Sequence, residues 1–341
     1  MARIISIMNN HFAPLEETID AFCRKLLSSD QHQTIAVAVS GGSDSMALCL
    51  LMHTWAQKNH CTLMALTVDH RLRENSLQEA QTVKKWIEER GIKHHILTWN
   101  HSSITTGIQK KAREARYDLL TNFCHQHNIK TICTAHHEAD QLETFLMRLS
   151  KGSGLEGLSV MKQLSVWNNV TIGRPLLSTQ PGILKEYLQT LPQKYINDPS
   201  NKDLKFERVQ WRTLLQNMNE QGLSMKQFPQ SLNRLQSVND FIDQTIEDAW
   251  NDVVMLTDDT ISISIVSLLQ LHECIATKII ARTLQQVSGK AYCAPYEKML
   301  DIFHQLQENR FKKHSVGGCV IAQKRAQLMI IKDERLQNAS L

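Results

Sequence analysis

A run of six residues, SGGSDS, follows a short apolar stretch and precedes a helical pattern. Two adjacent glycines allow positive φ and a close approach of the backbone to a ligand, so that successive N–H groups can point inward. The N-terminus of the following helix would add partial positive charge, and the serine hydroxyls would add donors. An anion of phosphate size is the expected guest of this loop, which consists of Ser40, Gly41, Gly42, Ser43, Asp44 and Ser45.

The acid in this loop narrows the chemistry further. Asp44 would repel a bare phosphate, and the loop lacks the lysine of a Walker A motif. A carboxylate here is useful if it holds Mg²⁺ between itself and the phosphate oxygens, so we expect Asp44 to be a magnesium ligand. The alternative is a plain turn in which Asp44 only caps the helix.

Polar and basic residues follow at two later points. Asp69 and His70 end the second apolar stretch, and ligands of open α/β sheets lie beyond the carboxyl ends of the strands, so both would border the bound anion. Arg113 and Arg116 are three apart on a helical pattern and therefore project from one face. Cations beside bound phosphate could stabilise charge that develops in a transition state. A polar loop and a solvated basic face are the respective alternatives.

A third group combines an imidazole with two carboxylates. His136, Asp140 and Glu143 stand at positions i, i+4 and i+7, which predicts one shared helical face near the ligand edge of the sheet. Such a face suits either a metal or a cationic amine. One of the carboxylates, or His136, could take the proton of an ammonium group as it attacks. Solvated surface is the alternative.

The elements that must position these residues alternate between strand and helix. The expected strands are apolar on both faces and are separated by helices, which predicts a parallel sheet covered on both sides, in a doubly wound α/β fold. We expect strands at residues 34–39, 62–68, 94–98 and 130–134, and helices at residues 45–57, 76–90, 108–127 and 137–150.

The pattern changes after about residue 215. Residues 231–254 and 271–287 are typical of helices, residues 260–265 alternate like a short exposed strand, and a strand pair is expected near Val320 and at residues 328–331. We therefore expect a catalytic domain over residues 1–217 and a smaller, mostly helical domain over residues 218–341.

Composition limits the class of protein. With 341 residues, 42% hydrophobic and 21% charged, the chain can bury a sizeable core, which excludes a disordered or coiled-coil protein. No apolar run is long enough for a membrane span, and the start does not resemble a secretory signal, so we expect a cytoplasmic protein with no membrane partner. Eight scattered cysteines form no CxxC pair, which gives a zinc knuckle no support.

The net charge of +4 allows a polyanionic partner. Basic residues gather in the last part of the chain, where they would suit either a nucleic acid or a solvated face: Arg310, Lys312, Lys313, Lys324, Arg325, Lys332 and Arg335. A second basic run could contact a nucleic-acid backbone, and it comprises Lys202, Lys205, Arg208 and Arg212.

Seven segments in order resemble one family. The loop alone is similar to the phosphate loop of the N-type ATP pyrophosphatases, also called the PP-loop family. The whole set, spanning residues 34 to about 215, resembles the tRNA(Ile)-lysidine synthetases: SGGSDS, VDHRLR, KAREARY, TAHHEADQLETFLMRL, KGSGLEGL, GRPLL and DPSNKDLKFERVQWR.

The resemblance implies a fold and a reaction. The fold would be that of the adenine-nucleotide α-hydrolases, with the later domain binding tRNA. ATP, with Mg²⁺, would adenylate the C2 carbonyl oxygen of the wobble cytidine in an isoleucine tRNA with anticodon CAU. The ε-amino group of free L-lysine would then attack C2 and release AMP. The lysidine formed would change codon and amino-acid specificity from Met to Ile.

The resemblance also implies residue roles. Residues Ser40 to Ser45 would bind ATP together with Asp69 and His70. The amine of lysine would be held by His136, Asp140 and Glu143, and the catalytic residues would be Asp44, Arg113, His136 and Asp140. The chain departs from the family at Ala139, where an aspartate is usual, and at Lys151, where arginine is common. We also expect it to lack the additional C-terminal domain that longer members of the family carry.

Alternatives remain open at this point. A tRNA-thiolating ATP pyrophosphatase is one, although such enzymes usually need paired cysteines. A small-molecule adenylating synthetase is another, although it leaves the basic second domain unexplained. A non-catalytic ATP sensor would have no use for an amine-binding face. The oligomeric state is not fixed by the sequence, and a homodimer is among the expected states.

Overall fold

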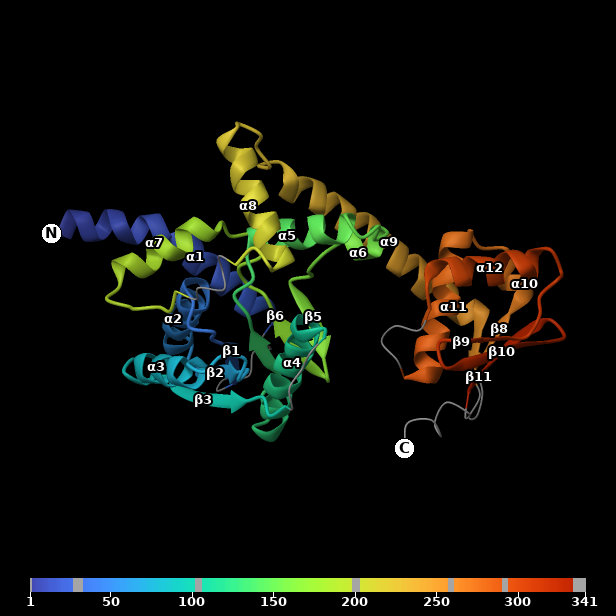
Figure 1. Cartoon of the computed structure of the whole chain (residues 1–341), viewed down its shortest axis with the longest axis horizontal. Helices are drawn as coiled ribbons and strands as arrows, with labels where there is room; N and C mark the ends of the chain where they lie inside the picture. The colour runs from blue at the N-terminus through green and yellow to red at the C-terminus, as the bar shows by residue number, and fades with distance from the viewer. Residues whose placement is uncertain are drawn as a thin grey trace. The chain divides into compact units, whose positions relative to one another are not determined.

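The computed structural model describes residues 2–26, 33–101, 106–197, 203–256, 261–289 and 294–333, with side chains described from residue 11 onward. The chain forms two compact units, Met1–Leu232 and Asn233–Leu341 (Figure 1). The division falls inside helix α9 (Phe228–Val253), later in the chain than the 217/218 boundary expected from the sequence. Each unit is described separately.

The first unit contains a six-stranded sheet in the order β3-β2-β1-β4-β6-β5. All neighbouring strands run parallel except β5, which pairs antiparallel with β6. The chain builds outward from β1 through β2 to β3 and then crosses to β4 on the other side of β1. The switch point therefore lies between β1 and β4, where doubly wound folds bind ligands. The strands are β1 (Thr34–Ala38), β2 (Thr62–Asp69), β3 (Lys93–Thr98), β4 (Thr131–Cys133), β5 (Leu164–Trp167) and β6 (Val170–Gly173).

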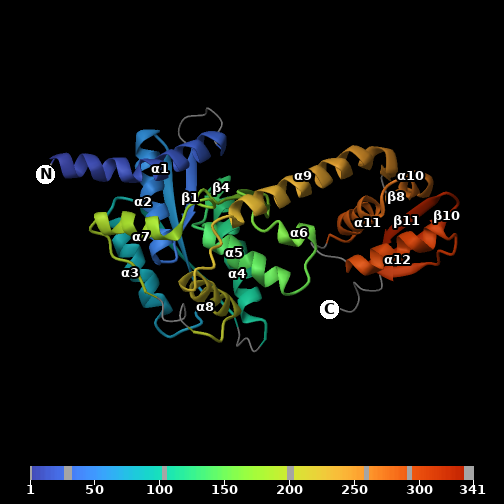
Figure 2. The same cartoon turned by 90° about the horizontal axis from the view of Figure 1, so that it is seen from above.

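Helices cover both faces of this sheet. Ile35 and Val37 of β1 face a core shared with α1, α2, α3 and α7, whereas Ala36, between them, faces a core shared with α4. This alternation on a buried strand confirms the predicted doubly wound α/β fold. Helices α2 and α7 lie side by side in both views (Figures 1 and 2). The helices are α1 (Ala2–Leu26), α2 (Ser43–Lys58), α3 (Ser76–Glu88), α4 (Ile108–Gln126), α5 (Glu138–Leu149), α6 (Leu155–Leu158), α7 (Pro181–Thr190) and α8 (Glu207–Glu220).

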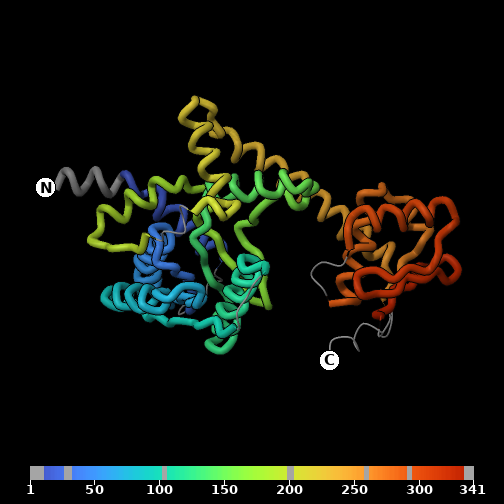
Figure 3. The backbone as a smooth tube through the Cα atoms, in the orientation of Figure 1, coloured from blue at the N-terminus to red at the C-terminus, as the bar shows by residue number. Residues whose placement is uncertain are grey.

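The segment after α7 returns to the loop between β1 and α2. The backbone N–H of Ile196 donates to the carbonyl of Gly41 at 2.8 Å, and Figure 3 traces this path of the chain. The next residues, Asp198-Pro199-Ser200-Asn201, which have the composition of a turn, lie outside the described residues, as does Lys202 of the basic run.

The second unit is mostly helical, as expected, and its sheet is larger than the sequence indicated. Its sheet has five antiparallel strands in the order β7-β8-β11-β10-β9, of which the sequence indicated only the inner three. The two edge strands are three residues each, too short to carry a period-2 signal. The core packs α11 and α12 with this sheet. The elements after α9 are β7 (Val254–Leu256), β8 (Ile261–Ser264), α10 (Ile265–Leu269), α11 (Glu273–Ser288), α12 (Tyr296–Gln307), β9 (His314–Val316), β10 (Cys319–Lys324) and β11 (Gln327–Lys332).

Among the described residues, no helix combines the length and apolar character that crossing a membrane requires.

Candidate functional site

The SGGSDS loop joins the end of β1 to the start of α2, as predicted. Gly41 has φ of 89°, and a Cβ at this position would lie 2.6 Å from Cγ2 of Val83 on α3. Glycine is therefore required here both by the backbone conformation and by the close packing of α3. Gly42 is the residue that precedes the first turn of α2, so the loop leads directly into the N-terminus of a 16-residue helix. This is the geometry of an anion site.

Some of the serine hydroxyls form hydrogen bonds within the loop itself. Ser45 Oγ accepts a hydrogen bond from the Ser40 N–H at 3.1 Å and donates to the carbonyl of Gly42 at 3.0 Å. The Ser40 hydroxyl lies 3.1 Å from the same oxygen. Ser45 is buried, whereas Ser40 is exposed and Ser43 is half-buried. Ser45 thus shapes the loop, and the other two serines remain closer to solvent.

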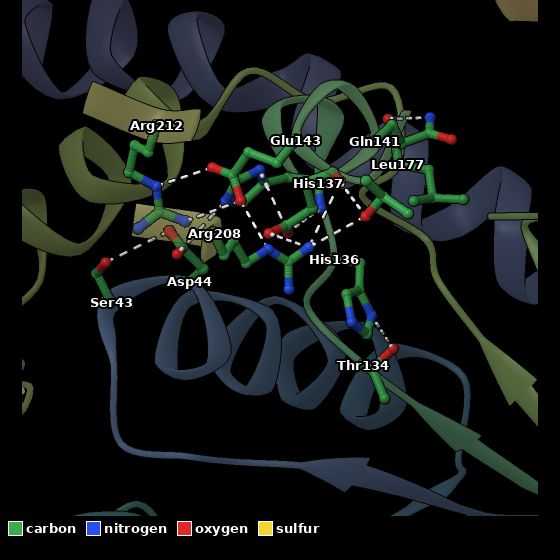
Figure 4. Close-up of polar contacts among 12 residues, drawn as sticks. Ser43, Asp44, Thr134, His136, His137, Gln141, Glu143, Leu177, Arg208 and Arg212 are labelled. Carbon is green, nitrogen blue, oxygen red and sulfur yellow. Dashed lines mark hydrogen bonds and ion pairs between the residues drawn. The ribbon is translucent and has the colours of Figure 1, made fainter. Parts of the chain in front are cut away.

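Helix α5 touches this loop through a histidine. His137 precedes the first turn of α5, and its Nε2 lies 3.6 Å from Oδ2 of Asp44 (Figure 4). Its Nδ1 lies 3.5 Å from Oδ2 of Asp140, which also accepts the backbone N–H of His137 at 3.0 Å. Burial lowers the pKa of His137, but the carboxylates of Asp44, Asp140 and Glu143 outweigh burial and raise that pKa above its ordinary value. The nearby carboxylates thus favour the protonated form of His137, whose ring contacts Asp44 of α2 and Asp140 of α5.

Glu143 is almost completely buried and is held by two arginines of α8. Arg208 Nε donates to its Oε2 at 2.7 Å, and Arg212 Nε donates to its Oε1 at 2.8 Å (Figure 4). Arg208 Nη2 also lies 3.5 Å from Oδ1 of Asp140. The sequence suggested that these arginines contact a nucleic-acid backbone; in the structure they are instead paired with the carboxylates of α5. Asp140 and Glu143 therefore do lie on α5 as predicted, but arginines of α8 pair with their carboxylates.

His136 does not belong to the helical face that the spacing predicted. Helix α5 begins at Glu138, so His136 precedes it and is out of step with Asp140 and Glu143. Its Nδ1 lies 2.8 Å from Oγ1 of Thr134, at the end of β4. The prediction of a shared face was wrong for this residue because the cap residue His137 starts the helix after it.

Burial lowers the pKa of His136 far below its ordinary value, and the positive charges of nearby arginines lower it further. The imidazole is therefore neutral near physiological pH. The arginines responsible are Arg116, Arg174, Arg113 and Arg208.

Asp69 and His70 lie at the carboxyl end of β2. Asp69 is 2% exposed, and its Oδ1 accepts the backbone N–H of Arg71 at 3.0 Å. Its Oδ2 and the Nδ1 of His70 are buried and have no hydrogen-bond partner among the described residues. Burial, together with the charge of Arg116, lowers the pKa of His70. Buried polar atoms without partners at the ligand edge of a sheet are atoms that a bound molecule can satisfy.

Arg113 and Arg116 share one aromatic neighbour on α4. Each guanidinium carbon lies 5.1 Å from the ring centroid of the buried Tyr117. Burial raises the pKa of Tyr117, but the charges of Arg116, Arg113 and Arg174 outweigh it and bring the pKa below its ordinary value. Arg113 is exposed, so its cation is accessible to a ligand. The strong local positive potential favours an anionic ligand at this edge.

The residues fit Mg²⁺ only together with a nucleotide. In the described part of the chain, no group of three or more His, Cys, Asp or Glu side chains is arranged to hold a metal alone. Asp44 is half-buried in the first turn of α2, and besides the His137 contact it accepts one hydrogen bond, from Ser43 Oγ at 3.3 Å. Mg²⁺ commonly takes one or two carboxylates and completes its coordination with phosphate oxygens and water. One accessible carboxylate beside an anion loop meets that requirement.

Two parts of this arrangement were not anticipated from the sequence. The role of His137 is the first, although a polar residue three before an acid is a helix-start signal. The pairing of Arg208 and Arg212 with Glu143 spans 65 and 69 positions and has no local signal.

Comparisons with known proteins support a single family. Residues 15–218 match the family described as PP-loop domain. The tRNA(Ile)-lysidine synthase of Wolbachia pipientis wMel is 35% identical over 319 residues, which cover 92% of this chain and 74% of the relative. The protein of the same name from Orientia tsutsugamushi (strain Boryong) is 44% identical over 189 residues, 55% of this chain and 43% of the relative.

Among solved structures, the U34-tRNA thiolase NcsA from Methanococcus maripaludis with its [4Fe-4S] cluster is similar with a TM-score of 0.54. It is 18% identical and covers 64% of this chain and 76% of that one. At this identity the likeness concerns the fold alone.

Proposed function

The chain belongs to the tRNA(Ile)-lysidine synthase family of PP-loop proteins, and from that membership we propose that it ligates free lysine to C2 of the wobble cytidine in an isoleucine tRNA with anticodon CAU. ATP adenylates the C2 carbonyl oxygen and releases pyrophosphate. The ε-amino group of lysine then forms the new C–N bond at C2, and AMP leaves with that oxygen. The product base pairs with A rather than G, so the tRNA changes from Met to Ile specificity.

One observation carries this proposal. The anion loop and the acidic helix α5 meet at the contact of 3.6 Å between Asp44 and His137, so the proposed ATP site and the proposed amine site would be adjacent. A reaction that first activates with ATP and then ligates an amine needs this adjacency, because the intermediate must be attacked before water reaches it.

The ATP site is assigned to residues Ser40 to Ser45, with Asp69 and His70 bordering the nucleotide. ATP is the substrate that this family uses. Asp44 would hold Mg²⁺, which when bound neutralises charge on the phosphates. Arg113, exposed on α4, would stabilise negative charge on the departing pyrophosphate or on the adenylated base.

The lysine site is assigned to His136, Asp140 and Glu143. Asp140 Oδ1 lies 3.5 Å from Arg208 Nη2, a long contact that leaves this oxygen able to accept an ammonium group. Glu143 contributes through α8, because Arg208, which it holds, also contacts Asp140. Burial and the nearby arginines make His136 a weak base, so the proton that the ammonium must lose before its nitrogen attacks is assigned to the carboxylate of Asp140, and the neutral imidazole of His136 is assigned to positioning.

The second unit is assigned to tRNA binding. Exposed lysines precede β9, and further basic residues lie at the turn between β10 and β11; phosphate contacts from such residues position a tRNA without reading its sequence. We also propose a cytoplasmic location, because free lysine, ATP and tRNA, which the reaction consumes, are available there. A homodimer is the proposed oligomeric state.

The test supplies purified protein with ATP, Mg²⁺ and labelled lysine, with and without unmodified isoleucine tRNA of anticodon CAU. We expect lysine label in that tRNA and none in variants of its anticodon. If adding tRNA causes pyrophosphate release but no lysine enters the tRNA, the adenylation step is supported and lysine is rejected as the nucleophile. No response to tRNA would reject the ligase altogether.

Thiolation is the weaker alternative. The chain has no CxxC pair, and five of the seven described cysteines are buried as free thiols. Burial raises the pKa of the Cys49 and Cys124 thiols to about 12, which disfavours the thiolate that sulfur transfer needs.

A further inference from the structure

Two polar side chains lie in the apolar core behind the anion loop. Thr67 on β2 is 4% exposed and His94 on β3 is 3% exposed. They adjoin a buried apolar cluster, since His94 pairs in register with Ala65 of β2 and Thr67 contacts Val39, and both of these residues belong to that cluster. Polar groups in such surroundings destabilise the fold unless they are hydrogen-bonded, so their partners indicate why they are there.

The two side chains form a chain that ends at the loop. His94 Nε2 lies 2.8 Å from Oγ1 of Thr67, and Thr67 Oγ1 donates to the carbonyl of Val39 at 2.6 Å. A carbonyl can only accept, so the single hydroxyl proton of Thr67 points at Val39. The Nε2 of His94 must then donate to Thr67, which fixes its tautomer and leaves Nδ1 unprotonated. Consistently, Nδ1 is buried without a partner among the described residues.

The peptide that receives this bond is the first of the loop. Because a trans peptide points its C=O and N–H in opposite directions, fixing the carbonyl of Val39 also fixes the direction of the N–H of Ser40. That N–H donates to Ser45 Oγ at 3.1 Å, and Ser45 Oγ donates in turn to Gly42 at 3.0 Å. The peptide plane is thus held from both sides, by β2 and by α2.

We propose that Thr67 and His94 are positioning residues that hold the anion loop in its ATP-binding conformation before ATP arrives. The inference rests on the proposed function, since it takes ATP as the ligand of the loop. Preorganised donors bind more tightly because the ligand does not have to order them. The apolar surroundings exclude water that would compete for the carbonyl of Val39, which strengthens the chain of hydrogen bonds.

The main test compares Thr67→Val with Thr283→Val. Thr67→Val removes the hydroxyl with little change in shape, and we expect the Kd and KM for ATP to rise about tenfold, with the KM for lysine within about twofold of wild type. Thr67→Ser keeps the donor and should lie within about twofold for ATP. Thr283→Val is the matched control: Thr283 is fully buried on α11 of the second unit and donates to the carbonyl of Ile279 at 2.8 Å.

Substitution of His94 provides a second test if Thr67→Val does not fold. His94→Gln can place an N–H near the position of Nε2, whereas His94→Met cannot donate. We expect His94→Met to weaken ATP binding about threefold and His94→Gln to restore most of it. Kd values are compared with unfolding midpoints for every variant.

The outcomes separate the inference from the proposed function. Wild-type protein that fails to bind ATP would reject the proposed function itself. If the wild-type protein binds ATP but Thr67→Val and Thr283→Val have the same Kd for ATP, the positioning role is overturned. Where Thr67→Val does not fold, equal Kd values for His94→Met and His94→Gln overturn it instead. A rise in the KM for lysine equal to that for ATP would also overturn it, because it would indicate general loosening.

Discussion

Arg212 on α8 donates to Glu143 on α5 at 2.8 Å, although 69 positions separate them in the sequence. The carboxylate is 1% exposed, so its charge is tolerated only because Arg212 and Arg208 accompany it. Helix α8 is thereby fixed against the helix that carries Asp140. The stability of the first unit and the shape of the proposed lysine site depend on the same carboxylate.

Glu143→Gln tests this dependence. The substitution leaves two guanidinium groups without their anion, and we expect the free energy of unfolding to fall by about 3 kcal/mol. Glu247→Gln is the control, because Glu247 forms an exposed pair with Arg282 at 2.7 Å and should change the same quantity by less than about 1 kcal/mol. Urea titrations measure both, and equal losses would show that Glu143 does not hold α8.

Asp140→Asn tests the assignment of the amine site. The change removes the charge that would face an ammonium group but keeps the side-chain size, so the KM for lysine should rise about tenfold, and more than that for ATP. Asp301→Asn in the second unit, where the carboxylate accepts from Gln305 at 2.8 Å, serves as the control for a lost surface charge. Parallel increases for lysine and ATP in the Asp140 variant would mean that this face binds something other than the amine.

Asp44→Asn tests the magnesium ligand. The amide keeps the shape of the loop but binds Mg²⁺ poorly, and we expect ATP-dependent pyrophosphate release to fall by about 100-fold. Raising the Mg²⁺ concentration should recover part of the loss if the defect lies in metal binding. A variant with the wild-type rate at low Mg²⁺ would remove Asp44 from the metal site.

The fold and the anion loop could be predicted because their signals are local. The strand over Thr34–Ala38, the loop and the helix that follows are contiguous, so each is read from a few neighbouring residues. The face of α5 could be predicted only in part. Its spacing placed Asp140 and Glu143 correctly relative to each other, but the helix start depends on which residue caps it, and that choice displaced His136.

The rest depends on contacts that sequence spacing does not encode. The partners of Glu143 come from a helix 65 to 69 positions away, and a basic run is equally compatible with nucleic acid or with a buried acid. The edge strands β7 and β9 form because neighbouring strands offer free backbone groups, not because their three residues have a pattern.

The pH dependence of stability tests the buried histidine behind the loop. Burial, with added repulsion from the charges of Lys84 and His95, lowers the pKa of His94 to about 4, against about 6.5 unfolded. The neutral form of His94 is the one that the fold accommodates, because the folded pKa is the lower one. The free energy of unfolding is therefore at its full value above pH of about 6.5 and falls by up to about 3 kcal/mol as the pH drops toward about 4. Urea midpoints measured between these pH values should fall less steeply for His94→Gln than for wild type, and equal slopes would show that His94 does not titrate in this range.

Basic residues of the second unit are tested by salt dependence. Lys312 and Lys313 are exposed just before β9, and each phosphate contact contributes about 0.7 to 0.9 to the slope of log K against log salt. The double variant Lys312→Ala with Lys313→Ala should therefore bind tRNA more weakly and lower the magnitude of the slope by about 1 to 2. Lys185→Ala with Lys194→Ala removes the same net charge from exposed positions of the first unit and should leave the slope unchanged. An identical reduction in both double variants would attribute the effect to overall charge and remove this surface from the proposed tRNA interface.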